Sequence, residues 1–260
     1  MRPLALHHSS IFSVPAVAIE PSNRNPKGQT AERWQQMGLD LNTLLLVTVY
    51  VEVLLGLLLL FAWIQDSQIY GIVWWAFAHF LRAGSIALFG MYGVVSDLIA
   101  FDLANSLLFT AFAMIWMGAR VFDGRPVQPF ALVAGAVVWL LVSRTSFLAD
   151  SVNTRALFST GIITTYTWLA AYEFWRGRSD QLVSRWPAIF LSFTYGALYL
   201  LHTPLTAKLP WNEVFSSVWL TVLSFEALLF TIAIAFVLLA LAKERTETRS
   251  KNALRRIYEY

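Results

Sequence analysis

Three charged residues fall inside long apolar segments of the chain, and they are the first candidates for chemistry. Glu52, Arg82 and Glu226 lie in the apolar segments 41–64, 69–93 and 214–241. At a rise of about 1.5 Å per helical residue, Glu52 is roughly 16 Å from the start of its segment, close to the middle of a bilayer. A lone charge there costs about 2.5–3.5 kcal/mol, so these side chains must face inward and pair. We expect Arg82 to bridge both carboxylates, because it is the only cation at that depth.

His79 lies one helical turn before Arg82 and shares its face. A cluster of Glu52, His79, Arg82 and Glu226 would join the first, second and seventh helices, and a purely structural role accounts for it. A sharper hypothesis is that the cluster, with nearby tyrosines, senses a proton, an ion or a small ligand and repacks the last helix. Transport of a proton or ion is a third reading. The tyrosines considered for this site are Tyr50, Tyr166 and Tyr195.

Residue types exclude several other kinds of chemistry. The chain has no cysteine, so it has no disulfide, thiolate ligand or thiol nucleophile. Its four lysines lie outside the apolar segments, which argues against a retinal Schiff base, and His79 with His202 is a weak basis for haem. The sequence has no phosphate-binding glycine loop, HExxH pair or GxSxG elbow. We therefore expect no catalytic residue, no metal ligand and no cofactor in this chain.

The elements that position these residues are predicted to be membrane-spanning helices. The 260 residues are 57% hydrophobic and 13% charged, and the mean hydropathy is +0.58, which is typical of a polytopic membrane protein. A crossing needs about 20 apolar residues. The pattern predicts an all-α bundle of seven transmembrane helices, the fourth resting on a short apolar core at 130–142. The segments are 41–64, 69–93, 98–118, 127–147, 154–175, 186–205 and 214–241.

Basic residues are distributed unevenly between the two sides of this bundle. The formal net charge is +3, but the basic residues flank apolar segments, where contact with anionic lipid headgroups accounts for their positions. The positive charge therefore does not indicate binding to nucleic acid. A cytoplasmic carboxyl terminus places eleven Lys and Arg on the inner side and three in the outer loops, although the amino-terminal tail adds four to the outer side. We expect the carboxyl terminus to be cytoplasmic. The inner set is Arg120, Arg125, Arg176, Arg178, Arg185, Lys243, Arg245, Arg249, Lys251, Arg255 and Arg256.

Three regions are predicted along the chain. Residues 1–38 read as a flexible tail that contains four prolines, with an alternative natural start at Met37. Residues 39–242 form the transmembrane domain, and residues 243–260 form a connector helix with charged pairs at i,i+4 spacing, such as Lys243 with Glu247. The residues expected to relay a signal are Lys243, Glu244, Arg245 and Glu247.

Long strings of this sequence resemble a known group, the amino-terminal membrane part of alphaproteobacterial diguanylate cyclases of the GGDEF family. The resemblance extends from Leu39 to about Arg249. The strings are LDLNTLLLVTVYVE at 39–52, FAHFLRAGSIALFGMYG at 77–93, GARVFDGR at 118–125, YTWLAAYEFWRGR at 166–178, SRWPAIF at 184–190 and SVWLTVLSFEALLFTIAIAFVLLALAKERTE at 217–247.

The resemblance implies a sensory or anchoring input module in the bacterial inner membrane, with lipid around it and a homodimeric state. In such proteins the AKERTE helix leads to a DPLTG opening and the GGDEF domain that makes cyclic di-GMP. This chain instead continues as SKNALRRIYEY and contains neither motif. It is therefore expected either to be part of a longer cyclase, with the output domain in cis, or to act on an output partner in trans. The alternative function is a small ion, proton or solute transporter that uses the Glu and Arg cluster.

Overall fold

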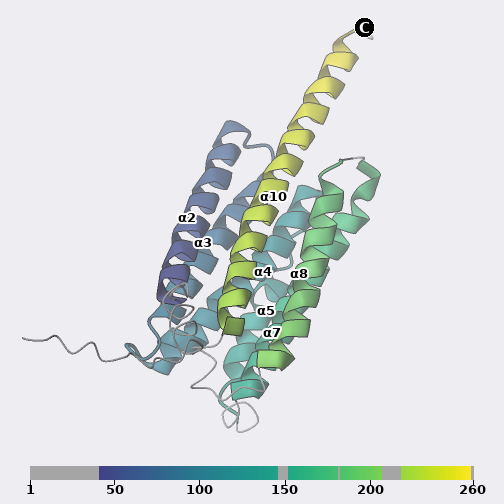
Figure 1. Cartoon of the computed structure of the whole chain (residues 1–260). Helices are drawn as coiled ribbons and strands as arrows, with labels where there is room; N and C mark the ends of the chain where they lie inside the picture. Colours follow the sequence, from purple (N-terminus) through teal and green to yellow (C-terminus); the bar gives the residue numbers. More distant parts are fainter. Residues whose placement is uncertain (1–40, 146–151, 181, 207–217, 259–260) are drawn as a thin grey trace, which may run out of the picture. The chain divides into compact units, whose positions relative to one another are not determined.

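Helices account for nearly all of the described structure. The computed structural model describes residues 41–145, 152–180, 182–206 and 218–258 (Figure 1). The predicted tail, with Met37, lies outside these residues. The α-helices are α2 (Leu41–Gln65), α3 (Tyr70–Gly90), α4 (Ala104–Phe122), α5 (Pro129–Val142), α7 (Val152–Arg176), α8 (Arg185–Thr206) and α10 (Val218–Tyr258), with a π-helix η1 (Leu98–Leu103) before α4 and a 3-10 turn η2 (Arg178–Asp180) after α7.

Each of the seven predicted segments overlaps one α-helix, and the third also covers the π-helix η1. Within the described residues, four helical stretches are long and apolar enough to cross a membrane: α2, α3, η1 with α4, and α10. The α5 helix has 14 residues, which is short for a full crossing. The all-helical class is confirmed, the long apolar helices suggest a membrane protein, and the count of seven crossings stays a prediction.

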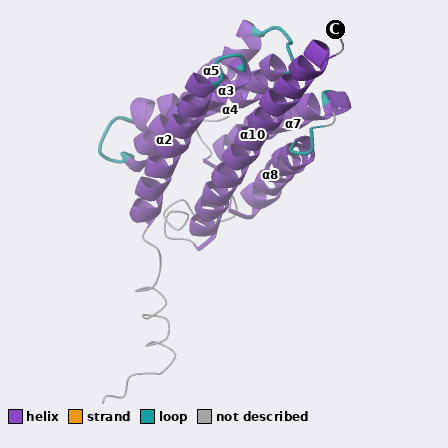
Figure 2. Ribbon diagram, turned by 90° about the horizontal axis from the view of Figure 1, so that it is seen from above, coloured by secondary structure: helices purple, strands orange, loops and turns teal. Residues whose placement is uncertain are grey.

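The helices of residues 39–260 pack as one compact unit. The α3 helix packs between α2 and α4, α4 also contacts α5 and α7, and α7 packs on α8 (Figures 1 and 2). The last helix, α10, packs against both α8 and α2. It therefore joins the first helix of the bundle to the sixth.

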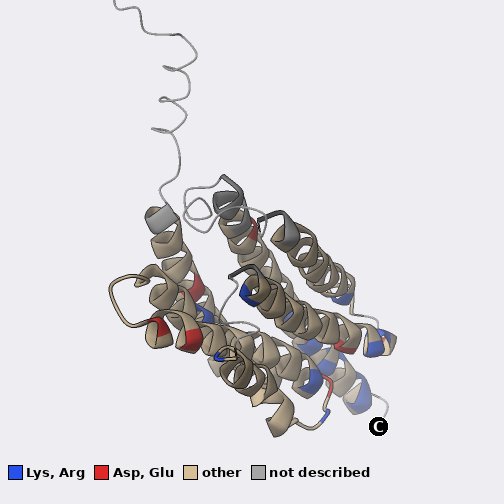
Figure 3. Cartoon of the chain, turned by 90° about the horizontal axis from the view of Figure 1, so that it is seen from below, with Lys and Arg blue, Asp and Glu red and all other residues tan. Residues whose placement is uncertain are grey.

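Successive helices run in opposite directions, so the bundle has two ends. We call the end at which α2, α4 and α7 finish and α10 emerges the exit end, and the opposite one the far end. Contacts of Thr246 with Asp66 and of Arg245 with the carbonyl of Phe122 place these connections together. Basic residues gather at the exit end (Figure 3). Gly124 forms the turn after α4 with φ of 73°, where the amide of Arg125 donates to the carbonyl of Arg120.

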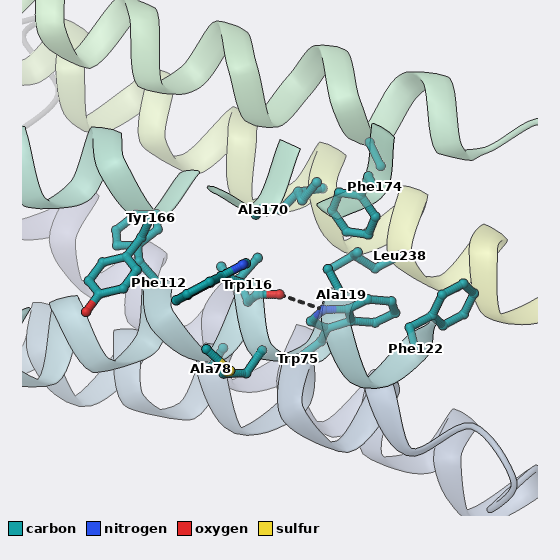
Figure 4. Close-up of a cluster of buried hydrophobic side chains, with 14 of the residues drawn as sticks. Trp75, Ala78, Phe112, Trp116, Ala119, Phe122, Tyr166, Ala170, Phe174 and Leu238 are labelled. Atoms are coloured by element: carbon teal, nitrogen blue, oxygen red, sulfur yellow. Dashed lines mark hydrogen bonds between the residues drawn. The ribbon is translucent and has the colours of Figure 1, made fainter. Parts of the chain in front are cut away.

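An apolar layer fills the bundle interior on the exit side of its middle. The indole of Trp75 is fully buried, donates to the carbonyl of Ile115 at 3.1 Å and packs near Phe122 and Phe174 (Figure 4). Gly118 makes room for it, because any Cβ there would overlap the indole. The residues we assign to this layer are Leu59, Ile72, Trp75, Phe122, Phe174, Leu238 and Leu241, each at most 4% exposed.

Candidate functional site: a buried charge cluster and the exit of α10

The carboxylate of Glu52 is fully buried and has three partners. His79 Nδ1 lies 2.6 Å from Oε2, Arg82 Nε lies 3.0 Å from Oε1, and the Thr231 hydroxyl donates to Oε1 at 2.9 Å. His79 and Arg82 project from one face of α3 toward α2, as their spacing of three residues predicts. We call these four residues the central cluster. It joins α2, α3 and α10 through one carboxylate.

Two side chains of the central cluster have ring or guanidinium nitrogens without a hydrogen-bond partner among the described residues. Arg82 Nη1 and His79 Nε2 are buried and have no hydrogen-bond partner among the described residues. The guanidinium of Arg82 lies over the Phe112 ring, 5.2 Å from its centroid. The ring of Phe112 in turn stacks on Tyr195 of α8. The cation is therefore held by Glu52 and by an aromatic face.

Glu226 has a different partner from the one that we expected. Its Oε2 lies 3.0 Å from Nδ1 of His202 on α8, and both side chains are about a fifth exposed, at 22% and 21%. The prediction that Arg82 bridges both carboxylates is wrong, because the central cluster and Glu226 are separated along α10 by more than one turn. We call His202 and Glu226 the outer pair, since it lies nearer the far end.

Two tyrosines of α8 lie between the outer pair and the central cluster. The rings of Tyr195 and Tyr199 are 5.2 Å apart between centroids, and Tyr195 stacks on Phe230 of α10 at 3.8 Å. The expectation that Tyr195 adjoins the cluster agrees with this geometry.

The other two tyrosines proposed for the site lie elsewhere. Tyr50 is 63% exposed on α2. The Tyr166 hydroxyl donates to the carbonyl of Ala131 at 2.8 Å and accepts from the amide of Gly135 at 3.0 Å, which ties α7 to α5. Tyr166 thus has a local packing role.

A second group of polar contacts holds α10 where it leaves the bundle. Glu244 accepts hydrogen bonds from the amide and hydroxyl of Ser184, at 3.1 and 2.8 Å, and Arg245 pairs with Asp180. Thr246 donates to Asp66 at 2.5 Å. We call these contacts the exit latch. They connect α10 to the loop after α2 and to the loop after α7.

Two of the four predicted relay residues belong to the exit latch and two do not. Glu244 and Arg245 contact the loops, as described above. Lys243 and Glu247 are exposed and lie 4.0 Å apart between Nζ and Oε1. This i,i+4 pair supports the helix itself, as the spacing predicts, and adds little stability because it is solvated.

A buried arginine beneath the latch links it to the rest of the bundle. Arg185 is 1% exposed, and its Nη2 lies 2.5 Å from Asp123 Oδ1 and 3.1 Å from Asp180 Oδ2. Asp180 is therefore shared by Arg185 and Arg245. We call Arg185, Asp123 and Asp180 the arginine hub.

A neighbouring ion group lies at the same end. Glu173 is 2% exposed and pairs with Arg120 at 2.6 Å and with Arg125 at 2.9 Å. The sequence analysis missed both this group and the hub, because it counted these arginines only as topology signals. Acidic residues lie among these arginines in the sequence, and they were the signal from which the ion pairs could have been predicted.

The far end carries a smaller ion pair. Asp102, in the π-helix η1, pairs with Arg144 beyond α5. π-Helical turns frequently occur at functional sites, but this pair connects only neighbouring elements. We assign it a packing role.

The described residues offer no group of three metal-ligating side chains. The arrangement instead suits charge pairing and proton exchange. A scan of family models, a search of curated proteins and a search of solved structures each found no match. The functional conclusion therefore depends on the geometry and on the resemblance in the sequence.

Proposed function

We propose that this chain is the membrane-embedded input module of a GGDEF-type signalling protein and that α10 carries its output. The observation that supports this most is the continuity of α10, a single helix of 41 residues from Val218 to Tyr258. One part of it contacts the central cluster through Thr231. Another part, about 20 Å further along at 1.5 Å per residue, forms the exit latch.

A rigid helix with polar contacts at two levels can transmit a local change. If a stimulus alters the charge around Glu52 or Glu226, α10 must shift or rotate to restore pairing, because a buried unpaired charge is costly. The exit latch opposes that movement with contacts that are partly exposed and therefore weak. Release of the latch would free the charged end of α10 to reposition an output domain.

The full proposal is a seven-crossing bundle in a bacterial inner membrane, with a cytoplasmic carboxyl terminus and a homodimeric state. The output domain, in cis or in trans, makes cyclic di-GMP from GTP, and the chain described here is not itself the enzyme. The basic residues at the exit end support this orientation, since positive loops are retained inside. The AKERTE string falls at the exit latch, where the resemblance places the connector.

Transport through the bundle is the alternative, and the apolar layer argues against it. A transporter of protons or ions needs polar groups or water along the whole path. Trp75, Phe122 and Leu238 lie between the central cluster and the exit latch, and all three are buried.

A fusion experiment tests the proposal. The chain is joined after Tyr260 to a GGDEF domain, and cyclic di-GMP synthesis is measured in membranes. We expect Glu52→Gln and Arg245→Ala each to change the output at least about threefold, with Tyr50→Phe as a control that leaves it unchanged. If an unrelated dimeric membrane anchor supports the same output as the bundle, and neither substitution alters it, the input function is wrong.

A further inference from the structure

The charged side chains of the central cluster and the outer pair do not balance when both histidines are neutral. Glu52 and Glu226 bring two carboxylates, and Arg82 brings the only permanent cation among the described residues that contact them. With His79 and His202 neutral, the central cluster and the outer pair together carry a formal charge of −1. A bare charge is strongly disfavoured in a medium of low dielectric constant. One additional positive charge would therefore stabilise the central cluster and the outer pair.

The carboxylate that lacks a cation is Glu226, in the outer pair. Glu52 already has Arg82, His79 and Thr231 as partners. Glu226 has His202 as its single ionic partner among the described residues, and its Oε1 has no hydrogen-bond partner there. A proton on His202 would convert this contact into an imidazolium–carboxylate pair and make the central cluster and outer pair neutral together.

We propose that the outer pair is a proton-binding site and that the proton is the ligand which this module senses. The inference rests on the proposed function only in its last step, transmission along α10. Protons reach the site from the far end. His202 lies near the end of α8, and the outer pair is about a fifth exposed, whereas Glu52 is fully buried and the apolar layer closes the exit side.

The titratable groups nearest the outer pair along α8 are Tyr199 and Tyr195, one and two turns before His202. The charged groups of the central cluster, Glu52, His79 and Arg82, lie deeper in the bundle, beside Thr231, which is five residues along α10 from Glu226. Loss of the proton leaves Glu226 beside a neutral imidazole, and the ionic attraction between His202 on α8 and Glu226 on α10 is lost. Arg82 stays with Glu52, because an unpaired carboxylate is costlier at the fully buried Glu52 than at the partly exposed Glu226.

The proton therefore decides whether an ion pair joins α10 to α8 at the outer pair. With the proton bound, the imidazolium of His202 attracts the carboxylate of Glu226. Without it, this attraction is lost, and α10 shifts along α8. Glu226 and Glu244 are 18 residues apart on one helix, about 27 Å, so the shift reaches the exit latch.

Proton binding is measured on the intact chain in lipid nanodiscs, without any output domain. Histidine side chains are labelled with ¹⁵N, and the His202 signal is assigned with His202→Gln. At the same pH, we expect the imidazolium fraction of His202 to be lower in Glu226→Gln than in the parent, because the carboxylate that pairs with the imidazolium is gone. Glu226→Asp should retain it.

Thr231→Val is the matched control, because it alters α10 beside Glu52 and leaves the outer pair intact. It should leave the His202 titration unchanged. A His202 that stays neutral throughout the titration, or that has the same imidazolium fraction in Glu226→Gln, overturns the proton site. That result would leave the relay along α10 standing, while a failed fusion experiment would leave the proton site standing.

Discussion

At the scale of single residues, the stability of the bundle interior depends on Glu52. Glu52→Gln keeps an acceptor for Thr231 but leaves the buried guanidinium of Arg82 without its counter-charge. We expect this substitution to lower the free energy of unfolding by about 3–5 kcal/mol. The double variant Glu52→Gln with Arg82→Met should recover most of the loss, because it removes the unpaired charge.

Reversible unfolding in mixed detergent micelles measures these changes. Tyr50→Phe serves as the control, because this exposed side chain of α2 should alter stability by less than about 0.5 kcal/mol. A single Glu52→Gln variant as stable as the parent would show that the ion pair contributes nothing.

Sequence reasoning predicted part of this site and missed the rest for definite reasons. Glu52, His79 and Arg82 were predictable, because charged and polar groups within apolar segments must find partners. Thr231 gave no signal, since a hydroxyl in a helix ordinarily bonds to its own backbone. The pairing of Glu226 with His202 depends on which helices are neighbours, and a single sequence does not specify that.

At the scale of elements, the contact between α3 and α4 depends on a small residue. A methyl group at Gly118 would overlap the Trp75 indole, which is fully buried. Gly118→Ala should therefore destabilise the bundle by about 1–3 kcal/mol, measured by thermal unfolding in detergent. Gly161→Ala on α7 is the control, since nothing lies within 4 Å of the added atom, and equal losses in both variants would contradict the packing argument.

The second prediction at this scale concerns the exit latch, which holds α10 where it leaves the bundle. Arg245→Ala removes the pair with Asp180 and should increase amide exchange in residues 246–258 at least about fivefold, because the end of α10 is then held by fewer contacts. Lys243→Ala alters only a solvated pair and should leave exchange unchanged. Hydrogen exchange followed by mass spectrometry distinguishes the two variants, and equal exchange in both would refute the latch.

Helix positions were more predictable than helix partners. The apolar segments located the seven α-helices of the described residues, and the absence of Gly or Pro after Val214 predicted the uninterrupted course of α10. The exit latch and arginine hub were not predictable, because they depend on loops that meet only after the bundle has packed. Arg185 shows this well, since its charge looked like a topology signal and its side chain is buried.

At the scale of the whole molecule, the orientation makes a direct prediction. The chain contains no cysteine, so single cysteines report position without interference. We expect cysteines at Ser67 and Asn252 to react with a membrane-impermeant thiol reagent only after the inner membrane is opened. A cysteine at Val94 should react in cells with an intact inner membrane and a permeable outer membrane. Labelling of all three positions from the same side would contradict the proposed crossings.

The central claim is that a change of charge inside the bundle moves α10 at the point where it leaves the bundle. Spin labels at Ser67 and Asn252, which are both exposed, measure this by pulsed electron paramagnetic resonance in nanodiscs. The account predicts that Glu226→Gln changes the distance between the labels by at least about 2 Å, the scale of helix shifts in switching proteins. Identical distance distributions in the parent and in this variant would contradict it.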